Sequence, residues 1–260
     1  MRWIVFVLLC FSRFGLAQDS IQSTLIKSDQ FKVDQIVSID NFNTLYYTSD
    51  NLSFNKKSDT QTVDYSNIQL GRITSADAFN TLKINLFYKD FNTVIILDNR
   101  LAEVFKIDFN ITQPYKNVSL VSTGYDNTIW IFNQDLQQLE LYDYKANITR
   151  VSSLPIQDNI LAIESDYNYC WLLTDKHLYV YNYFGSLITK YENQGYTNLR
   201  IDSGNIFLQR ENHLYILPKN SDDIKPVKLP ELLISQFLVT NETLYIYDDE
   251  MLHQFQLKID

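Results

Sequence analysis

Acidic residues recur at one place in this sequence, in the polar turn that follows each of six apolar runs. They are Asp50, Asp98, Asp135, Asp175, Glu211 and Asp249, the last within the acidic stretch 248–250. If these turns gather on one face of the protein, their carboxylates could bind a cation or a basic partner. Turn formation explains the same residues without a ligand, because Asp hydrogen-bonds nearby backbone N–H groups and tolerates left-handed conformations. We expect turn formation to be the main reason for them, and we keep them as candidate binding residues.

Three basic or imidazole side chains lie in the same turns. Arg100 follows Asp98 by two positions, and His177 and His213 occupy the same place in neighbouring segments, each followed by Leu-Tyr. Imidazoles at equivalent positions could share a metal ion. No histidine and carboxylate spacing typical of a zinc motif surrounds them, so we expect no metal site.

A long segment between two repeats could also contribute to binding. Arg72 lies in the segment 71–77, within the longest interval between repeated segments, and we expect this segment to project as a loop beside the acidic turns. A poorly packed connector is the alternative.

Aromatic residues mark the turn before the apolar run in the first four segments: Phe42, Phe91, Tyr125 and Tyr167. Exposed rings would form a stacking platform for sugars or for a protein partner. Because burying a large ring gains about 2 kcal/mol or more, we expect these rings to be buried between the repeats.

The sequence lacks the short motifs that carry common chemistries. It has no Gly-x-Ser-x-Gly, no phosphate-binding glycine loop and no His-Glu-x-x-His. We therefore predict no catalytic residue and no cofactor. A hydrolase that uses paired carboxylates from different repeats leaves no linear spacing to detect, so that alternative stays open.

The elements that must position these side chains form a repeat. Each segment has an apolar strand, a polar turn and an alternating strand, with an Asn before the apolar strand at positions 43, 92, 127, 168, 205 and 241, at intervals of 49, 35, 41, 37 and 36. Repeats of roughly 40 residues with about four strands each are typical of propeller blades. The sequence thus predicts an all-β, six-bladed β-propeller with four-stranded antiparallel blades. Helical periodicity is limited to one turn near 75–82.

Closure of the ring can also be predicted. The last repeat has only three strands before the sequence ends at Asp260, and the strand-like stretch 21–33 precedes the first repeat. We expect that stretch to become the outermost strand of the last blade.

Two phrases resemble known propeller repeats. The run Asp126-Asn127-Thr128-Ile129-Trp130 resembles the Asp-Gly-x-Leu-Trp phrase of propellers in bacterial sensor proteins, and residues 94–101 are similar to the NHL repeat. Both lack the glycines of those families, and they cover short parts of two repeats. The resemblance implies the architecture of a secreted bacterial β-propeller and no activity.

The first residues have the pattern of a secretory signal. One early Arg, a short apolar run and small residues before Ala17 predict cleavage after residue 17, which leaves a single propeller domain at 18–260 with no transmembrane span. We therefore expect a secreted or periplasmic protein. Cleavage leaves Cys170 as the only cysteine, which its apolar neighbours predict to be a buried small apolar residue.

These observations favour an exported, non-catalytic binding or scaffold propeller. The net charge of −9 disfavours binding to nucleic acid. We expect a monomer whose partner is another envelope or secreted protein, a small ligand or a glycan. The alternative is a carbohydrate-active propeller enzyme with paired carboxylates.

Overall fold

The computed structural model describes residues 20–259. The predicted signal peptide, residues 1–17, lies outside the described residues. Among residues 20–259, no helix is long and apolar enough to cross a membrane.

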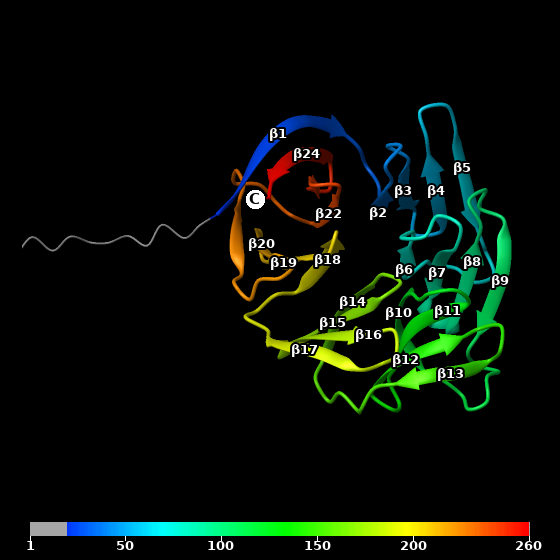
Figure 1. Ribbon diagram of the computed structural model, residues 1–260. Coiled ribbons are helices and arrows are strands. Elements are labelled where there is room, and N and C mark those ends of the chain that lie inside the picture. The colour runs from blue at the N-terminus through cyan, green and yellow to red at the C-terminus, as the bar shows by residue number, and fades with distance from the viewer. Residues whose placement is uncertain (1–19, 260) are drawn as a thin grey trace, which may run out of the picture.

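The described chain is a six-bladed β-propeller, as predicted, with its sheets arranged in a ring (Figure 1). Blade 1 contains β2 (Gln35–Ile39), β3 (Leu45–Ser49), β4 (Ser53–Lys57) and β5 (Thr62–Ser66). Blade 2 contains β6 (Ser75–Asp77), β7 (Ile84–Tyr88), β8 (Thr93–Leu97) and β9 (Glu103–Asp108). Blade 3 contains β10 (Val118–Thr123), β11 (Thr128–Asn133), β12 (Gln138–Asp143) and β13 (Ile148–Ser152).

The second half of the chain continues the same order. Blade 4 contains β14 (Ile160–Ser165), β15 (Tyr169–Thr174), β16 (His177–Asn182) and β17 (Leu187–Glu192). Blade 5 contains β18 (Asn198–Asp202), β19 (Asn205–Arg210), β20 (His213–Leu217) and β21 (Lys225–Lys228). Blade 6 contains β22 (Gln236–Thr240), β23 (Thr243–Tyr247), β24 (Met251–Lys258) and β1 (Ile21–Gln30).

The N-terminal strand closes the ring, which confirms the prediction. β1 pairs antiparallel with β24, from Gln22 opposite Lys258 to Gln30 opposite Met251. Its first residues also pair in parallel with β21, so blades 5 and 6 form one continuous eight-stranded sheet. On the other side of blade 6, the inner strand β22 contacts β2 of blade 1.

Blade 2 departs from the expected register. Asn92 precedes β8, the third strand of its blade, whereas Asn43 and Asn127 precede second strands. The true second strand is β7, and the expected helical turn near 75–82 contains the short inner strand β6 instead. Counted from the first residues of the second strands, the intervals are 39, 44, 41, 36 and 38, more even than those between the Asn residues.

Antiparallel order divides the turns between two faces. The front face holds the second-to-third-strand turns and the connections between blades, and the back face holds the first-to-second and third-to-fourth-strand turns. Apolar side chains between neighbouring blades form the core, as in the cluster of Tyr46, Phe54, Leu86, Tyr88 and Ile95 between blades 1 and 2. The rigid core fixes where each turn lies.

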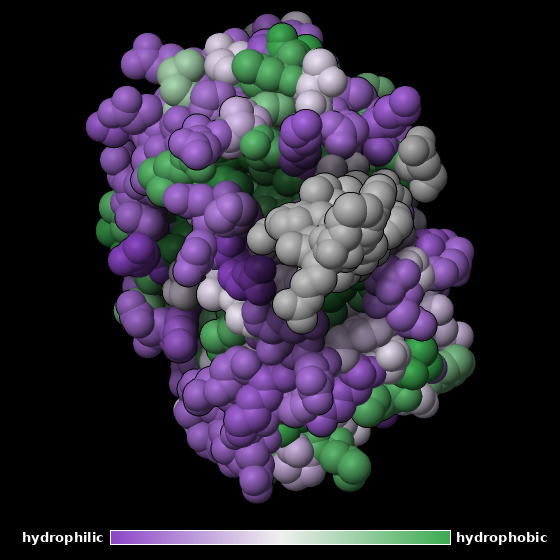
Figure 2. Space-filling view, turned by 90° about the vertical axis from the view of Figure 1, so that its left-hand side faces the viewer, coloured by the Kyte–Doolittle hydropathy of each residue, from purple (hydrophilic) through white to green (hydrophobic). Residues whose placement is uncertain are grey.

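The surface formed by blades 5 and 6 is largely hydrophilic. Figure 2 shows this side of the ring with scattered apolar side chains among polar ones.

Candidate functional site

Most of the predicted acidic turns do lie on the front face. Asp50, Asp135, Asp175, Glu211 and Asp249 all lie in second-to-third-strand turns. Among the residues that the structure describes, no three His, Cys, Asp or Glu side chains are grouped so that they could hold a metal ion.

Asp98 and Arg100 lie on the back face, and their expected placement was wrong. Because β8 is a third strand, the turn that carries them joins it to the fourth strand, β9. The Asp98 carboxylate accepts the backbone N–H groups of Arg100 and Ala102 at 2.8 and 2.9 Å, and these hydrogen bonds lower its pKa. Asp98 is thus a turn-forming residue.

The front-face carboxylates have similar partners. Asp135 accepts the side-chain amide of Asn117 at 2.8 Å, and Asp175 accepts the backbone N–H of Asn159 at 3.0 Å. Asp50, Glu211 and Asp249 adopt positive φ angles of 53°, 53° and 78°, as tight turns require. The positive φ angles are those of turn formation, and the hydrogen bonds of Asp135 and Asp175 attach their turns to the connections that precede blades 3 and 4.

The two equivalent histidines differ in their surroundings. The Nδ1 of His177 lies 2.8 Å from Asp158, which also accepts the hydroxyl of Tyr179 at 3.0 Å. Burial alone would raise the pKa of Asp158, but hydrogen bonds from His177, Tyr179 and Lys176 outweigh it and lower the pKa to about 2. His213 is exposed at the start of β20. Asp158 was not among the sequence candidates.

The connector that carries Arg72 lies on the front face but does not project. Arg72 is exposed, whereas Leu70 and Ile73 on either side are buried in the core between blades 1 and 2. The backbone N–H of Ile73 donates to the carbonyl of Asn51 at 2.8 Å. Burial of these two apolar side chains holds the connector against the blades while Arg72 stays exposed.

Three of the four turn aromatics are exposed, contrary to the expectation of burial. The exposed fractions are 86% for Phe42, 47% for Phe91 and 44% for Tyr167, and Tyr125 is half-buried. Strand aromatics such as Tyr46 and Phe87 already fill the space between blades. Phe91 lies on the front face, because of the register of blade 2, and the other three lie on the back face.

Cys170 is buried, as expected. Burial raises the pKa of its thiol well above the ordinary value, with a smaller contribution from Glu164. A buried, protonated thiol packs as a small apolar side chain.

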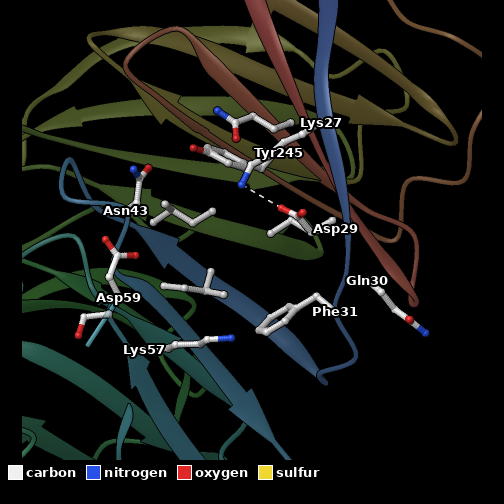
Figure 3. A pocket seen from close by; sticks show the side chains of 13 residues that line it. Lys27, Asp29, Gln30, Phe31, Asn43, Lys57, Asp59 and Tyr245 are labelled. Atoms are coloured by element: carbon white, nitrogen blue, oxygen red, sulfur yellow. Dashed lines mark ion pairs between the residues drawn. The ribbon is translucent and has the colours of Figure 1, made fainter. Parts of the chain in front are cut away.

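A groove between blades 6 and 1 was not anticipated from the sequence (Figure 3). Its volume is about 460 Å³. Apolar side chains from both blades form its floor: Phe31, Ile39, Leu45, Tyr245 and Leu252. Polar side chains lie along its walls: Lys27, Asp29, Asn43, Lys57, Asp59 and Gln254.

The charged residues on the two walls belong to two copies of the same sequence, Lys-Ser-Asp. Lys27-Ser28-Asp29 lies on β1, and Lys57-Ser58-Asp59 begins at the end of β4. The Nζ of Lys27 lies 2.9 Å from the Asp29 carboxylate. The Nζ of Lys57 lies 5.6 Å from the ring centre of Phe31 and has no ion-pair partner among residues 20–259. The repeated phrase was the one signal in the sequence, and only ring closure brings its two copies together.

A second cluster of ionisable side chains lies around the axis of the ring. Glu164 on β14 forms an ion pair with Arg200 on β18, the neighbouring inner strand. Burial raises the pKa of Glu164 to about 7 against the opposing charge of Arg200, and the Asp77 carboxylate at the end of β6 adds to the rise. Glu164 and Arg200 were not sequence candidates, and Asp77 was included only as the last residue of the segment 71–77, because three different blades contribute the cluster.

The comparisons with known proteins identify the fold. The sequence matches no protein-family model and no curated protein. A catalytically inactive variant of virginiamycin B lyase from Staphylococcus aureus, solved with quinupristin, has a TM-score of 0.62 and 9% identity over 85% of this chain and 80% of its own. A chain of the Mitotic Checkpoint Complex has a TM-score of 0.62 and 10% identity over 98% of both chains. The WD40 domain of Pan2 from Neurospora crassa has a TM-score of 0.58 and 9% identity over 86% of this chain and 75% of its own. Similarity at this level of identity establishes a β-propeller without a function.

Proposed function

We propose that this chain is a non-catalytic binding propeller whose binding site is the groove between blades 6 and 1. The observation that carries the proposal is the combination of an apolar floor with charged residues of both signs on two facing walls. A volume of about 460 Å³ is within the range of sites that hold small ligands or short segments. The occupant therefore needs apolar groups for the floor and ionised groups for the walls.

An apolar segment of a partner polypeptide, flanked by charges of both signs, has this chemistry. Its side chains would pack on Ile39, Leu45 and Leu252, where burial of apolar surface supplies most of the affinity. A carboxylate of the segment would meet Lys57, whose ammonium has no competing carboxylate within ion-pair distance among the described residues. Charges on the walls would then fix the register of the segment.

The acidic turns support a non-catalytic function. Asp98, Asp135 and Asp175 accept hydrogen bonds from their own turns or from adjacent connections. Carboxylates engaged in this way hold the loops in place. As part of the same proposal, the partner is another envelope or secreted protein, in keeping with the predicted signal peptide.

Selection of displayed peptides tests the proposal. We expect a library of random heptapeptides on phage, panned against the purified protein, to enrich apolar sequences with flanking charges. A synthetic copy of an enriched peptide should bind Lys57→Glu about tenfold more weakly, by isothermal titration calorimetry, because the substitution places a carboxylate on the groove wall. The matched control is Lys106→Glu, a lysine that is also exposed and lies on β9 of blade 2, and this variant should bind the peptide as the parent does. Failure to enrich any sequence, or equal binding to both variants, would contradict the proposal.

A carbohydrate-active enzyme is the second candidate, and one observation favours it. Glu164 has its pKa raised to about 7, as a general acid requires, and the Asp77 carboxylate is close enough to contribute to that rise. Release of reducing ends from oligosaccharides would support this function over the first.

A further inference from the structure

We propose that the back-face end of the propeller axis binds a neutral carbohydrate, with Phe79 and Tyr167 as the stacking surface and Glu164 with Arg200 as the hydrogen-bonding pair. This site lies apart from the groove between blades 6 and 1. It draws on residues from blades 2, 4 and 5.

The aromatic part of the site consists of two exposed rings that contact each other. Phe79 and Tyr167 lie in the turns that follow the inner strands β6 and β14, and their exposed fractions are 51% and 44%. Their ring centres are 5.1 Å apart in an edge-to-face arrangement. Each ring therefore supports the other while apolar surface stays open for the C–H face of a sugar.

The polar part of the site has unused hydrogen-bonding capacity. Oε1 of Glu164 accepts from Nη1 of Arg200, while Oε2 of Glu164 and Nη2 of Arg200 have no hydrogen-bond partner among residues 20–259. The Nε of Arg200 is a buried donor that also lacks a partner within the described chain. A carboxylate and a guanidinium side by side can accept from one sugar hydroxyl and donate to its neighbour.

Asp77 joins the two parts into one cluster. Its carboxylate accepts the backbone N–H of Phe79 at 2.9 Å and that of Thr123 at 2.7 Å, so it holds the turn that carries the first ring. Burial raises the pKa of Tyr167, and the nearby Asp77 carboxylate adds to the rise. Hydrogen bonds also connect Asp77 to β14, since Ser122 donates to Asp77 at 3.2 Å and accepts the hydroxyl of Ser165, the residue after Glu164, at 2.7 Å. The rings and the ion pair therefore lie in one region of the back face.

The charges in the cluster favour a neutral ligand over a cation. Arg200 already neutralises Glu164, and Asp77 accepts three donors from its own chain, the third being the hydroxyl of Ser122 at 3.2 Å. The same engagement leaves Asp77 poorly placed to act as a nucleophile or base. We therefore expect binding without cleavage.

Titration with defined sugars tests the proposal. The probes are cellohexaose, chitohexaose and mannohexaose, with tetramethylammonium chloride as a cationic comparison, all measured by isothermal titration calorimetry against the full chain. At least one hexasaccharide should bind, and Tyr167→Ala and Glu164→Gln should each weaken it about tenfold. Phe91→Ala is the matched control, because Phe91 is a similarly exposed turn aromatic on the front face, and it should bind as the parent does.

Three results would overturn the proposal. They are the absence of binding by all three sugars at millimolar concentration, binding of tetramethylammonium with the same dependence on Tyr167 and Glu164, and equal losses in Tyr167→Ala and Phe91→Ala. Circular dichroism of each variant checks that it is folded. Shorter sugars in the titrated samples would instead support the second candidate function, and peptide binding at the groove is measured independently of all these outcomes.

Discussion

Ser28 and His253 face each other across the seam of the ring, with the Ser28 Oγ 2.8 Å from the imidazole Nδ1. The other ring nitrogen of His253 lies 3.0 Å from the Asp248 carboxylate. One imidazole thus links the closing strand β1 to β24 and to the turn before β24. The outer part of blade 6 depends on a strand that lies more than two hundred residues away in the sequence.

Removal of the closing strand should abolish cooperative folding. Deletion of residues 18–33 removes the backbone pairing of β1 with β24 and exposes the edge of β24. We expect loss of the cooperative thermal transition by circular dichroism. The control is Ser28→Ala, which removes one hydrogen bond and should lower stability by about 1 kcal/mol. An unchanged melting temperature in the deletion would contradict the closure of the ring by β1.

The buried ion pair in blade 3 should contribute far more to stability than an exposed one. The Nζ of Lys116 lies 2.5 Å from Glu140, and both side chains are almost fully buried. Glu140→Ala strands the ammonium without its partner, and we expect a loss of about 3–5 kcal/mol in the free energy of unfolding by urea. Asp29→Ala, which breaks the exposed pair with Lys27, should lose less than about 1 kcal/mol. Similar losses in the two variants would show that burial of the Lys116 pair is not the decisive factor.

Asp158 should make the protein sensitive to acid. Its folded-state pKa of about 2 lies below the usual value of about 3.9, so its contribution is complete above pH 4 and is lost as the pH falls through 2. Asp158→Asn should therefore lower stability by about 2 kcal/mol at pH 6, and the difference from the parent should shrink as the pH approaches 2. Urea denaturation across this range measures both. Asp222→Asn, at an exposed position in the turn between β20 and β21, is the control and should change the free energy of unfolding little.

Glu164 should have the opposite effect at higher pH. Because its pKa is raised to about 7, the protonated form is favoured in the folded state, and that stabilisation is complete below about pH 4 and is lost as the pH rises through 7. The melting temperature should therefore fall between pH 5 and pH 8, and Glu164→Gln should reduce the fall. Parallel melting curves for the two proteins across this range would mean that Glu164 titrates normally.

The fold could be predicted because blades 1 to 5 are each formed by a continuous stretch of sequence, whose strands and turns can be recognised from neighbouring residues. Alternating strands, polar turns and a missing fourth strand in the last repeat indicated six blades and a closing N-terminal strand. The same local similarity misled in blade 2, where Asn92-Thr93 resembles the Asn-Thr that begins second strands, while the true second strand follows the buried Lys83. Because β8 was taken for a second strand, Asp98 was predicted on the front face and Phe91 on the back face, and each lies on the opposite one.

The candidate sites could not be predicted because they are assembled from distant segments. Lys27 and Lys57 line the same groove only after the ring closes, and Glu164, Arg200 and Asp77 come near one another only because the inner strands of three blades surround one axis. The solvent exposure of the turn aromatics could not be predicted from neighbouring residues either, since it depends on whether rings from other strands already fill the space between blades. Sequence patterns report which residues turn the chain, and the tertiary structure decides which of them remain free for a ligand.

The pairing of β1 with β24 brings the two ends of the described chain together. Gln22 lies opposite Lys258, so a short peptide could join residue 259 to residue 20 and turn the two strands into an ordinary hairpin. New ends could then open in any exposed connection between blades, and the order of blades in the gene would rotate while the ring stayed the same. The fold therefore does not require the chain to start at β1, and circular permutants that start in another blade should form the same ring.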